Sequence, residues 1–162
     1  MTDLQVRDLD FDDPRQSAAF LSLLDHYARD PMGGGDALSA EVRRTLPGKL
    51  GAVSGFHGAI AWHGDQPIGL INCFTGFSTF KAMPLLNVHD LVVHADWRGR
   101  RIGEDLLAWA ARRARELGCC KLTLEVLANN HVAKRCYRRA GFAPYVLDPA
   151  AGAAELMQRF LD

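Results

Sequence analysis

The stretch NVHDLVVHADWRGRRIG, residues Asn87–Gly103, decides the fold of this chain. It begins as a strand, because Val88 and the run from Leu91 to Val93 crowd β-branched and apolar side chains into a few positions. The chain then turns over residues 94–97, and a helical pattern begins near Ile102. We therefore predict a strand, a loop and a helix N-terminus in one continuous piece.

The loop has the chemistry of an anion site. The first turn of a helix leaves backbone N–H groups without partners and carries a partial positive charge. Gly99 and Gly103 have no Cβ, so a phosphate can approach the backbone closely, and Arg98, Arg100 and Arg101 supply formal charge. These residues indicate a diphosphate site, but they would equally suit a solvated basic turn. The run has two glycines four apart, which does not satisfy the G-x-G-x-x-G fingerprint of dinucleotide-binding folds.

Two ordered segments resemble the GNAT superfamily of N-acetyltransferases. Val92–Val93 running into Trp97–Gly103 is similar to its acetyl-CoA motif, Q/R-x-x-G-x-G/A, with Arg98 first and Gly103 last. Arg101 stands where the middle glycine is usual, and it would either narrow the approach of the pyrophosphate or add a phosphate contact. Residues 129–142 resemble the superfamily's N-x-x-A-x-x-x-Y followed by G-F. The resemblance covers roughly residues 56–147.

The resemblance implies an acetyl-CoA site and a catalytic acid. The acid would be Tyr137, seven residues after Asn130, although the same helical face also suits a core tyrosine. Asn130 would either cap its helix or bond the pantetheine arm. The implied cofactor-binding residues are Leu91, Val92, Val93, Arg98, Gly99, Arg100, Arg101, Ile102, Gly103, Glu104, Asn130 and Ala133.

The catalytic base is expected on the strand before the loop. His89 and Asp90 lie where members of the superfamily often carry a Glu, sometimes a His. Strand alternation sends the two to opposite faces unless a bulge intervenes. We favour His89, because an imidazole is mostly neutral at cytoplasmic pH. Two alternatives stay open. The base could be Asp90 or a water, and His89 could serve only as a hydrogen-bonding group inside the sheet. The N–H of Leu91 or Val93 is the expected oxyanion donor.

Composition sets the outer bounds. At 162 residues we expect one N-acetyltransferase domain over residues 1–162. With 19 basic and 19 acidic residues the net charge is zero, so nothing global argues for a nucleic-acid or membrane partner. The acidic N-terminus lacks a signal peptide's apolar core, and the four cysteines show no metal-ligand pairing. We expect a cytoplasmic protein with reduced thiols and no metal. Homodimers are common in the resembling superfamily.

The remaining chain predicts a mixed α/β fold with helices on both faces of a central sheet of six to seven strands. Helices are expected from Arg15, over 39–50, over 101–117 and from Asn130 to Ala140, although Pro47 and Gly48 make the end of the second uncertain. The resemblance implies a splay between the strands at 87–93 and 121–127 that admits the pantetheine arm. The strands are expected near 4–9, 56–62, 68–77, 87–93, 121–127, 142–147 and 155–161.

By the same resemblance, the acceptor pocket would come from residues 30–36 and 74–86. Residues 76–93 are similar to polyamine and diamine acetyltransferases, and Asp30, Asp36 and Asp90 could hold a cationic amine. The function implied is transfer of acetyl from acetyl-CoA to a primary amine of a small molecule. The alternatives are a protein or peptide N-acetyltransferase and a non-catalytic acyl-CoA-binding regulatory domain.

Overall fold

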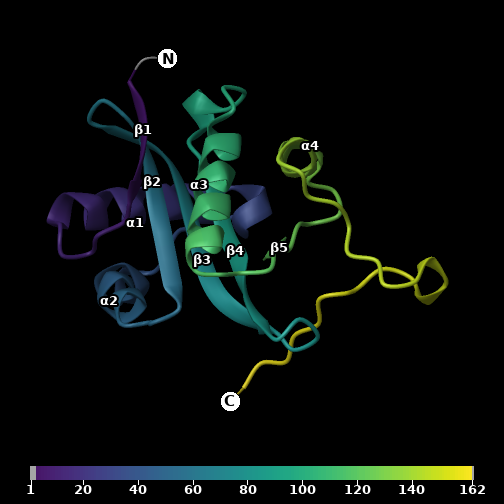
Figure 1. The fold of residues 1–162 in the computed structure, drawn as a ribbon. Helices are drawn as coiled ribbons and strands as arrows, with labels where there is room; N and C mark the ends of the chain where they lie inside the picture. Colours follow the sequence, from purple (N-terminus) through teal and green to yellow (C-terminus); the bar gives the residue numbers. More distant parts are fainter. Residues whose placement is uncertain (1–2, 162) are drawn as a thin grey trace.

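A computed structural model describes residues 3–161 of the chain as one sheet flanked by helices (Figure 1). The strands are β1 (Leu4–Asp8), β2 (Phe56–His63), β3 (Gln66–Ser78), β4 (Met83–Val93) and β5 (Leu122–Leu124). The helices are α1 (Pro14–Arg29), α2 (Ala40–Gly51), α3 (Ile102–Glu116) and α4 (His131–Arg139). Three short 3₁₀ turns are η1 (Pro31–Gly33), η2 (Ala95–Trp97) and η3 (Pro149–Ala151).

The strands lie in the order β1-β2-β3-β4-β5. The first four pair antiparallel, and β4 pairs parallel with β5, so the sheet is mixed. The parallel pair is joined through α3, the crossover connection that such a pair requires. The predicted α/β architecture, with helices on both faces, is confirmed.

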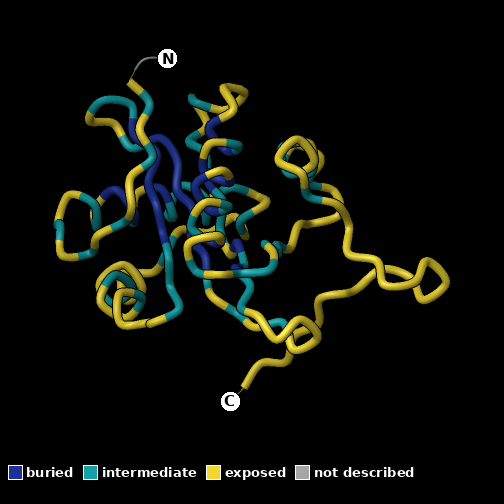
Figure 2. Tube along the Cα trace, in the orientation of Figure 1, coloured by how far each residue is buried: buried dark blue, intermediate teal, exposed yellow. Residues whose placement is uncertain are grey.

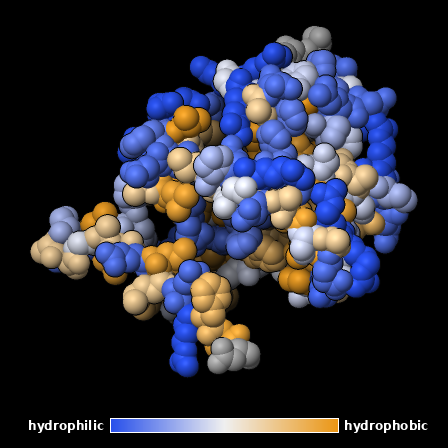
Figure 3. All heavy atoms as spheres, turned by 180° about the vertical axis from the view of Figure 1, so that it is seen from behind, coloured by the Kyte–Doolittle hydropathy of each residue, from blue (hydrophilic) through white to orange (hydrophobic). Residues whose placement is uncertain are grey.

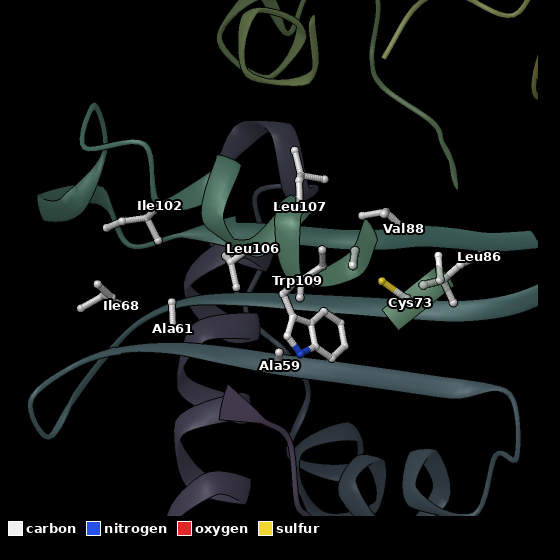
Figure 4. Packing of buried hydrophobic residues seen from close by; sticks show 13 residues of the cluster. Ala59, Ala61, Ile68, Cys73, Leu86, Val88, Ile102, Leu106, Leu107 and Trp109 are labelled. Carbon is white, nitrogen blue, oxygen red and sulfur yellow. The ribbon is translucent and has the colours of Figure 1, made fainter. Parts of the chain in front are cut away.

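Each face of the sheet carries its own apolar core. On one face α1 packs Phe20 and Leu23 against Leu70 and Val92 of the sheet. On the other face α3 packs Leu106 and Trp109 against β2 and β3, as Figure 4 shows at close range. Alternation along β2 explains the division, because Ile60 belongs to the first core while Ala59 and Ala61 belong to the second. The sheet therefore separates two compartments, one under α1 and one under α3.

Local signals set the helix starts. The Asp13 side chain accepts a hydrogen bond from the N–H of Arg15, and Pro14 follows in the first turn of α1. Ser39 caps α2 by accepting from the N–H of Val42 at 3.2 Å. Helix α2 continues through Pro47 to Gly51, further than the proline suggests. Leu46 and Leu50 pack against the α1 core, and this burial outweighs the poor local propensity.

The predicted splay lies between β4 and β5. The two strands pair only from Leu86–Leu122 to Val88–Leu124, and the Asn87 amide donates to Thr123 Oγ1 at 3.0 Å in the paired part. Beyond Val88, β4 continues to Val93. Over this part it pairs with β3 on one edge. The strand expected over 121–127 forms only at Leu122–Leu124, so the backbone on the β5 side of this second half has no strand partner among the described residues.

The C-terminal strands predicted at 142–147 and 155–161 are wrong, and so is the count of six to seven strands. Within the described residues the chain after Gly141 forms no strand, and it runs away from the body with its side chains largely exposed (Figures 1 and 2). Apolar side chains of this segment, including Leu156 and Phe160, are exposed. Figure 3 shows hydrophobic groups along the part of the chain that projects from the body. Alternation indicates strand propensity, but a strand also needs a partner, and β5 is only three residues long.

Candidate functional site: a row of free amides and a cavity beside β4

The loop between β4 and α3 presents a row of unpaired backbone amides. Within residues 3–161, the N–H groups from Gly99 to Gly103 have no hydrogen-bond acceptor. Gly99 adopts φ +78° and Arg101 φ +64°, and this left-handed turn precedes the start of α3. Successive N–H groups at such a turn and a helix N-terminus form a concave anion site. The loop therefore presents free N–H groups where the sequence predicts a diphosphate site, and the diphosphate itself stays a prediction.

The arginines of this loop differ in what they contact. Arg98 donates to the carbonyl of Val93 at 3.3 Å and to Asp30 Oδ2 at 3.1 Å. The Arg100 guanidinium lies over the ring of Trp97, 4.7 Å from its centroid. Arg98 therefore braces the loop against the end of α1. Arg101 occupies the left-handed position that glycine fills in the resembling motif, which makes backbone strain a feature of this loop.

Gly103 has a packing role that the sequence did not reveal. It is buried, and a Cβ built on it would meet Cys136 Sγ of α4 at 3.0 Å. The absence of a side chain lets α4 pack closely on the first turn of α3. Glu104 joins the two helices as well, through an ion pair with Arg139 at 2.7 Å. The side chains of Val92 and Ile102 are buried in the two cores, so only their backbone remains for contact with a ligand.

The edge of β4 that faces away from β3 carries a second set of N–H groups. The N–H of His94 donates to Ile68 of β3 at 2.9 Å. Alternation along an antiparallel ladder then turns the N–H groups of Val93 and Leu91 to the opposite edge, toward the gap beside β5. These are the two groups expected to stabilise an oxyanion. The N–H groups of residues 94–98, which are all hydrogen-bonded, separate them from the free amides that begin at Gly99.

Helix α4 borders the gap with Tyr137. Asn130 caps this helix by accepting from the N–H of Ala133 at 3.1 Å, in agreement with the capping interpretation. Tyr137 is partly buried and packs at a tilt on Phe142, with 6.0 Å between ring centroids. Burial raises the pKa of Tyr137 to about 12, and Cys136 and Tyr27 add to the rise. The phenol therefore keeps its proton throughout the physiological range.

On the other face of β4 a cavity of about 330 Å³ opens between the sheet, α1 and α2. Both His89 and Asp90 line it. The register of β3 and β4 explains why: Asn72 pairs with Asp90 and Cys73 with Val88, so His89 is the extra residue of a β-bulge. The bulge allows two consecutive residues to serve one cavity. The apolar lining consists of Phe20, Leu24, Ala28, Gly33, Leu38, Leu46, Leu50 and Phe74.

Two polar residues of this cavity were missed by the sequence analysis. Asn72 is only 2% exposed, and its amide donates to Asp90 Oδ2 at 3.0 Å. Its Oδ1 is buried without a partner in the described chain. An asparagine inside the apolar run around Ile71 was the available signal. The sequence analysis placed Tyr27 only in the apolar stripe of α1. Burial raises the pKa of Tyr27, and the nearby charges of Asp90 and Asp30 raise it further.

The predicted acidic cluster does not assemble. Asp90 lines the cavity, whereas Asp30 is paired with Arg98, and Asp36 is not part of the lining. The hydrogen bond from the Met32 N–H is the main cause that lowers the pKa of Asp30, and the Arg98 guanidinium lowers it further. The described residues contain no cluster of three or more His, Cys, Asp or Glu able to hold a metal, and none of their helices is long and apolar enough to span a bilayer.

Comparison with known proteins adds three findings. Residues 20–142 match the model of the family described as "Acetyltransferase (GNAT) family". An aminoalkylphosphonate N-acetyltransferase of Salmonella typhimurium is 31% identical over 86 residues, 53% of this chain and 56% of that protein. A streptothricin acetyltransferase of Streptomyces lavendulae is 45% identical over 65 residues, 40% of this chain and 34% of that protein. The chain thus spans about half and about a third of these two curated relatives.

A solved structure extends the likeness over nearly the whole chain. An aminoglycoside N-acetyltransferase in complex with CoA superposes with a TM-score of 0.72 at 13% identity. The superposition covers 98% of this chain and 94% of that one. At this identity the likeness concerns the fold alone.

Proposed function

Because the chain belongs to the acetyltransferase (GNAT) family, we propose that it moves an acetyl group from acetyl-CoA to a primary amine of a small molecule. Bound acetyl-CoA would supply a thioester, so that a C–N bond forms as the C–S bond breaks. An acceptor that binds as the ammonium ion would lose two protons from nitrogen, one before the attack and one as the amide forms; the departing sulfur would take up one, and one would pass to solvent. The residues described above would bind the donor, hold the amine and move these protons.

The single observation that carries the proposal is the presence of two sets of free backbone donors, one at each end of the loop that follows β4. The amides from Gly99 to Gly103 suit a diphosphate, and the open edge from His89 to Val93 suits an amide-rich arm that adds to the sheet like a strand. The residues present therefore fit coenzyme A in both its charged and its amide-bearing parts. The N–H of Leu91 or Val93 would donate to the oxygen that gains charge during the transfer.

The two faces of β4 divide the acid–base work. On the cavity side Asp90 would attract the ammonium form of the acceptor, and His89, next to it on the bulge, would take a proton from it. On the other side Tyr137 would protonate the departing sulfur. Its raised pKa keeps the proton on the phenol until it is needed.

A small-molecule acceptor is supported by the shape of the cavity. The hollow of about 330 Å³ is bounded by two helices and the sheet, whereas a peptide would need an open groove. The names of the two curated relatives point the same way, since they refer to an aminoalkylphosphonate and to streptothricin.

Calorimetry with acetyl-CoA at low salt, combined with a free-thiol assay over a panel of amines, tests the proposal. We expect binding together with turnover of at least one small amine. Binding without turnover of any amine would favour a regulatory domain, and acetylation of peptides alone would favour the protein acetyltransferase. Failure to bind coenzyme A would end the proposal.

The acid is tested with Tyr137→Phe. Loss of a general acid should lower kcat by about 10²-fold or more, with the KM for acetyl-CoA nearly unchanged. Tyr145→Phe is the matched control, because Tyr145 is 56% exposed on the C-terminal segment. An unchanged kcat in Tyr137→Phe would remove the proposed role of this phenol.

A further inference from the structure

The residues that line the cavity between α1, α2 and the sheet limit which class of amine it can bind. We propose that it takes a monoamine with an apolar body, such as an arylalkylamine, whose ammonium group binds at Asn72 and Asp90. This inference rests on the proposed function and names its substrate class.

A buried acceptor without a partner marks the ammonium position. The Asn72 amide nitrogen donates to Asp90 at 3.0 Å, which assigns Oδ1 as the remaining acceptor. This oxygen is buried and has no partner among the described residues, although Asn72 lines the cavity. A buried polar atom normally has a partner. An ammonium group carries three donors, so one group can serve Asn72 Oδ1 and the Asp90 carboxylate together.

The charge of the cavity disfavours amines that would bring a second charged group against its walls. Among the lining residues that the structure describes, Asp90 is the one carboxylate, and lysine and arginine are absent. Arg98, on the neighbouring loop, is already paired with Asp30 at 3.1 Å. A phosphonate or carboxylate on the acceptor would therefore lack a cation, and the further charges of a polyamine would lack anions. Burying such unpaired charges is strongly unfavourable.

The walls of the cavity are apolar over most of their extent. Phe20 and Leu24 come from α1, Leu46 and Leu50 from α2, and Phe74 from β3. The Phe74 ring stands edge-on to His89, with 5.3 Å between centroids, and so joins the apolar wall to the polar end. An aromatic or branched aliphatic body would bury its surface here, and its size is limited by a volume near the lower end of known ligand sites.

A panel of compounds that each carry a primary amine tests the proposed substrate class. It contains 2-phenylethylamine, 2-aminoethylphosphonate, spermidine and an aminoglycoside, each assayed by thiol release from acetyl-CoA. We expect 2-phenylethylamine to give a kcat/KM that exceeds each of the others by about tenfold or more. A preference for the phosphonate or a polycation would overturn the inference while leaving the acetyltransferase proposal intact. Turnover of no amine would overturn both.

The ammonium site is tested first without a variant. 2-Phenylethanol has the same body as 2-phenylethylamine but a neutral hydroxyl, and its inhibition constant should lie about tenfold or more above the KM for the amine. Equal values would show that Asn72 and Asp90 do not hold the charge. Asn72→Leu should raise the KM for the amine about tenfold and leave the KM for acetyl-CoA unchanged, whereas an unchanged amine KM would contradict the site.

The apolar wall is tested by a matched pair on α2. Leu46→Ala should raise the KM for the arylalkylamine roughly fourfold or more, because contacts with the body are lost. Val42→Ala lies on the same helix, is exposed and is outside the lining, so it should leave that KM unchanged. Equal effects of the two variants would contradict the placement of the apolar body against α2.

Discussion

Arg98 Nη2 donates to Asp30 Oδ2 at 3.1 Å, and this ion pair ties the loop after β4 to the turn that ends α1. The loop carries the free amides, and the turn borders the acceptor cavity through Gly33. The pair therefore connects the two proposed substrate sites at their common edge.

Arg98→Gln should impair acetyl-CoA binding by the loop more than it lowers the stability of the fold. The two side chains are 49% and 24% exposed, so we expect the free energy of unfolding to fall by less than about 1 kcal/mol. The KM for acetyl-CoA should rise several-fold, because the loop loses its brace and a positive charge. Arg29→Gln, which breaks an ion pair with Asp25 on α1 itself, is the control. A similar KM change in both variants would contradict the special role of Arg98.

Arg101→Gly should stabilise the protein. Arg101 adopts φ +64°, a conformation that costs a residue with a Cβ roughly 1–2 kcal/mol, and part of this gain is offset by the flexibility of glycine in the unfolded chain. We expect a net increase of about 0.5–1 kcal/mol in urea unfolding. Arg100→Gly, next to it but without a positive φ, should instead lose stability. Loss of stability in Arg101→Gly would show that its side chain compensates for the strain.

Gly103→Val should separate α3 from α4. Even a Cβ here meets Cys136 Sγ at 3.0 Å, so a larger side chain should cost about 1–3 kcal/mol. Cys136→Ala should restore part of this loss in a double-mutant cycle. Gly48→Ala, in α2 with open space around it, should gain up to about 1 kcal/mol. Additive effects of the Gly103 and Cys136 variants would rule out their contact.

Acid should destabilise the protein partly through His26. Burial lowers the pKa of His26, and the nearby His94 and Arg98 lower it further. The His26 Nε2 accepts a hydrogen bond from the N–H of Ala95 at 3.2 Å, and the ring stacks on that of His94. Asp30 and Asp96 oppose this shift only in part. As pH falls through about 6.5 the unfolded chain takes up the proton first, so the free energy of unfolding decreases.

His26→Gln keeps an oxygen that can accept the Ala95 N–H but removes the titrating ring. Urea unfolding between pH 8 and pH 5 should therefore show a smaller loss of stability in the variant than in the wild type. The comparison at pH 8, where the imidazole is neutral, isolates the cost of the substitution itself. Equal losses on acidification would mean that His26 does not contribute to the acid sensitivity.

Short-range signals predicted the central part of the fold. The strand before Val93, the loop through Gly99 and the helix from Ile102 occur in order, as do the caps at Ser39 and Asn130. Each depends on neighbours a few residues apart, so the order of residues in the chain contains the information. The C-terminal strands were predicted by the same alternation and are absent from the described residues, because pairing also needs a partner edge of sufficient length.

The cavity was predicted only in part. The loop at Gly33 and the strand at Phe74 were expected to contribute, and they do. Asn72 was not, because a single asparagine in an apolar strand does not reveal which cross-strand residue it will meet. The register of β3 against β4 places it beside Asp90 and creates the bulge at His89. The expectation that strand alternation separates His89 from Asp90 holds for a regular strand and fails at a bulge.

The sequence by itself determined the family motif, the strand–loop–helix unit and the free amides at its turn, because these depend on local backbone preferences and on the absence of side chains at glycine. The tertiary structure decided which side chains share a compartment: Asp90 with Asn72, Arg98 with Asp30, and Gly103 with Cys136. These partners come from separate elements, and pairing register and helix packing, which no single segment encodes, bring them together.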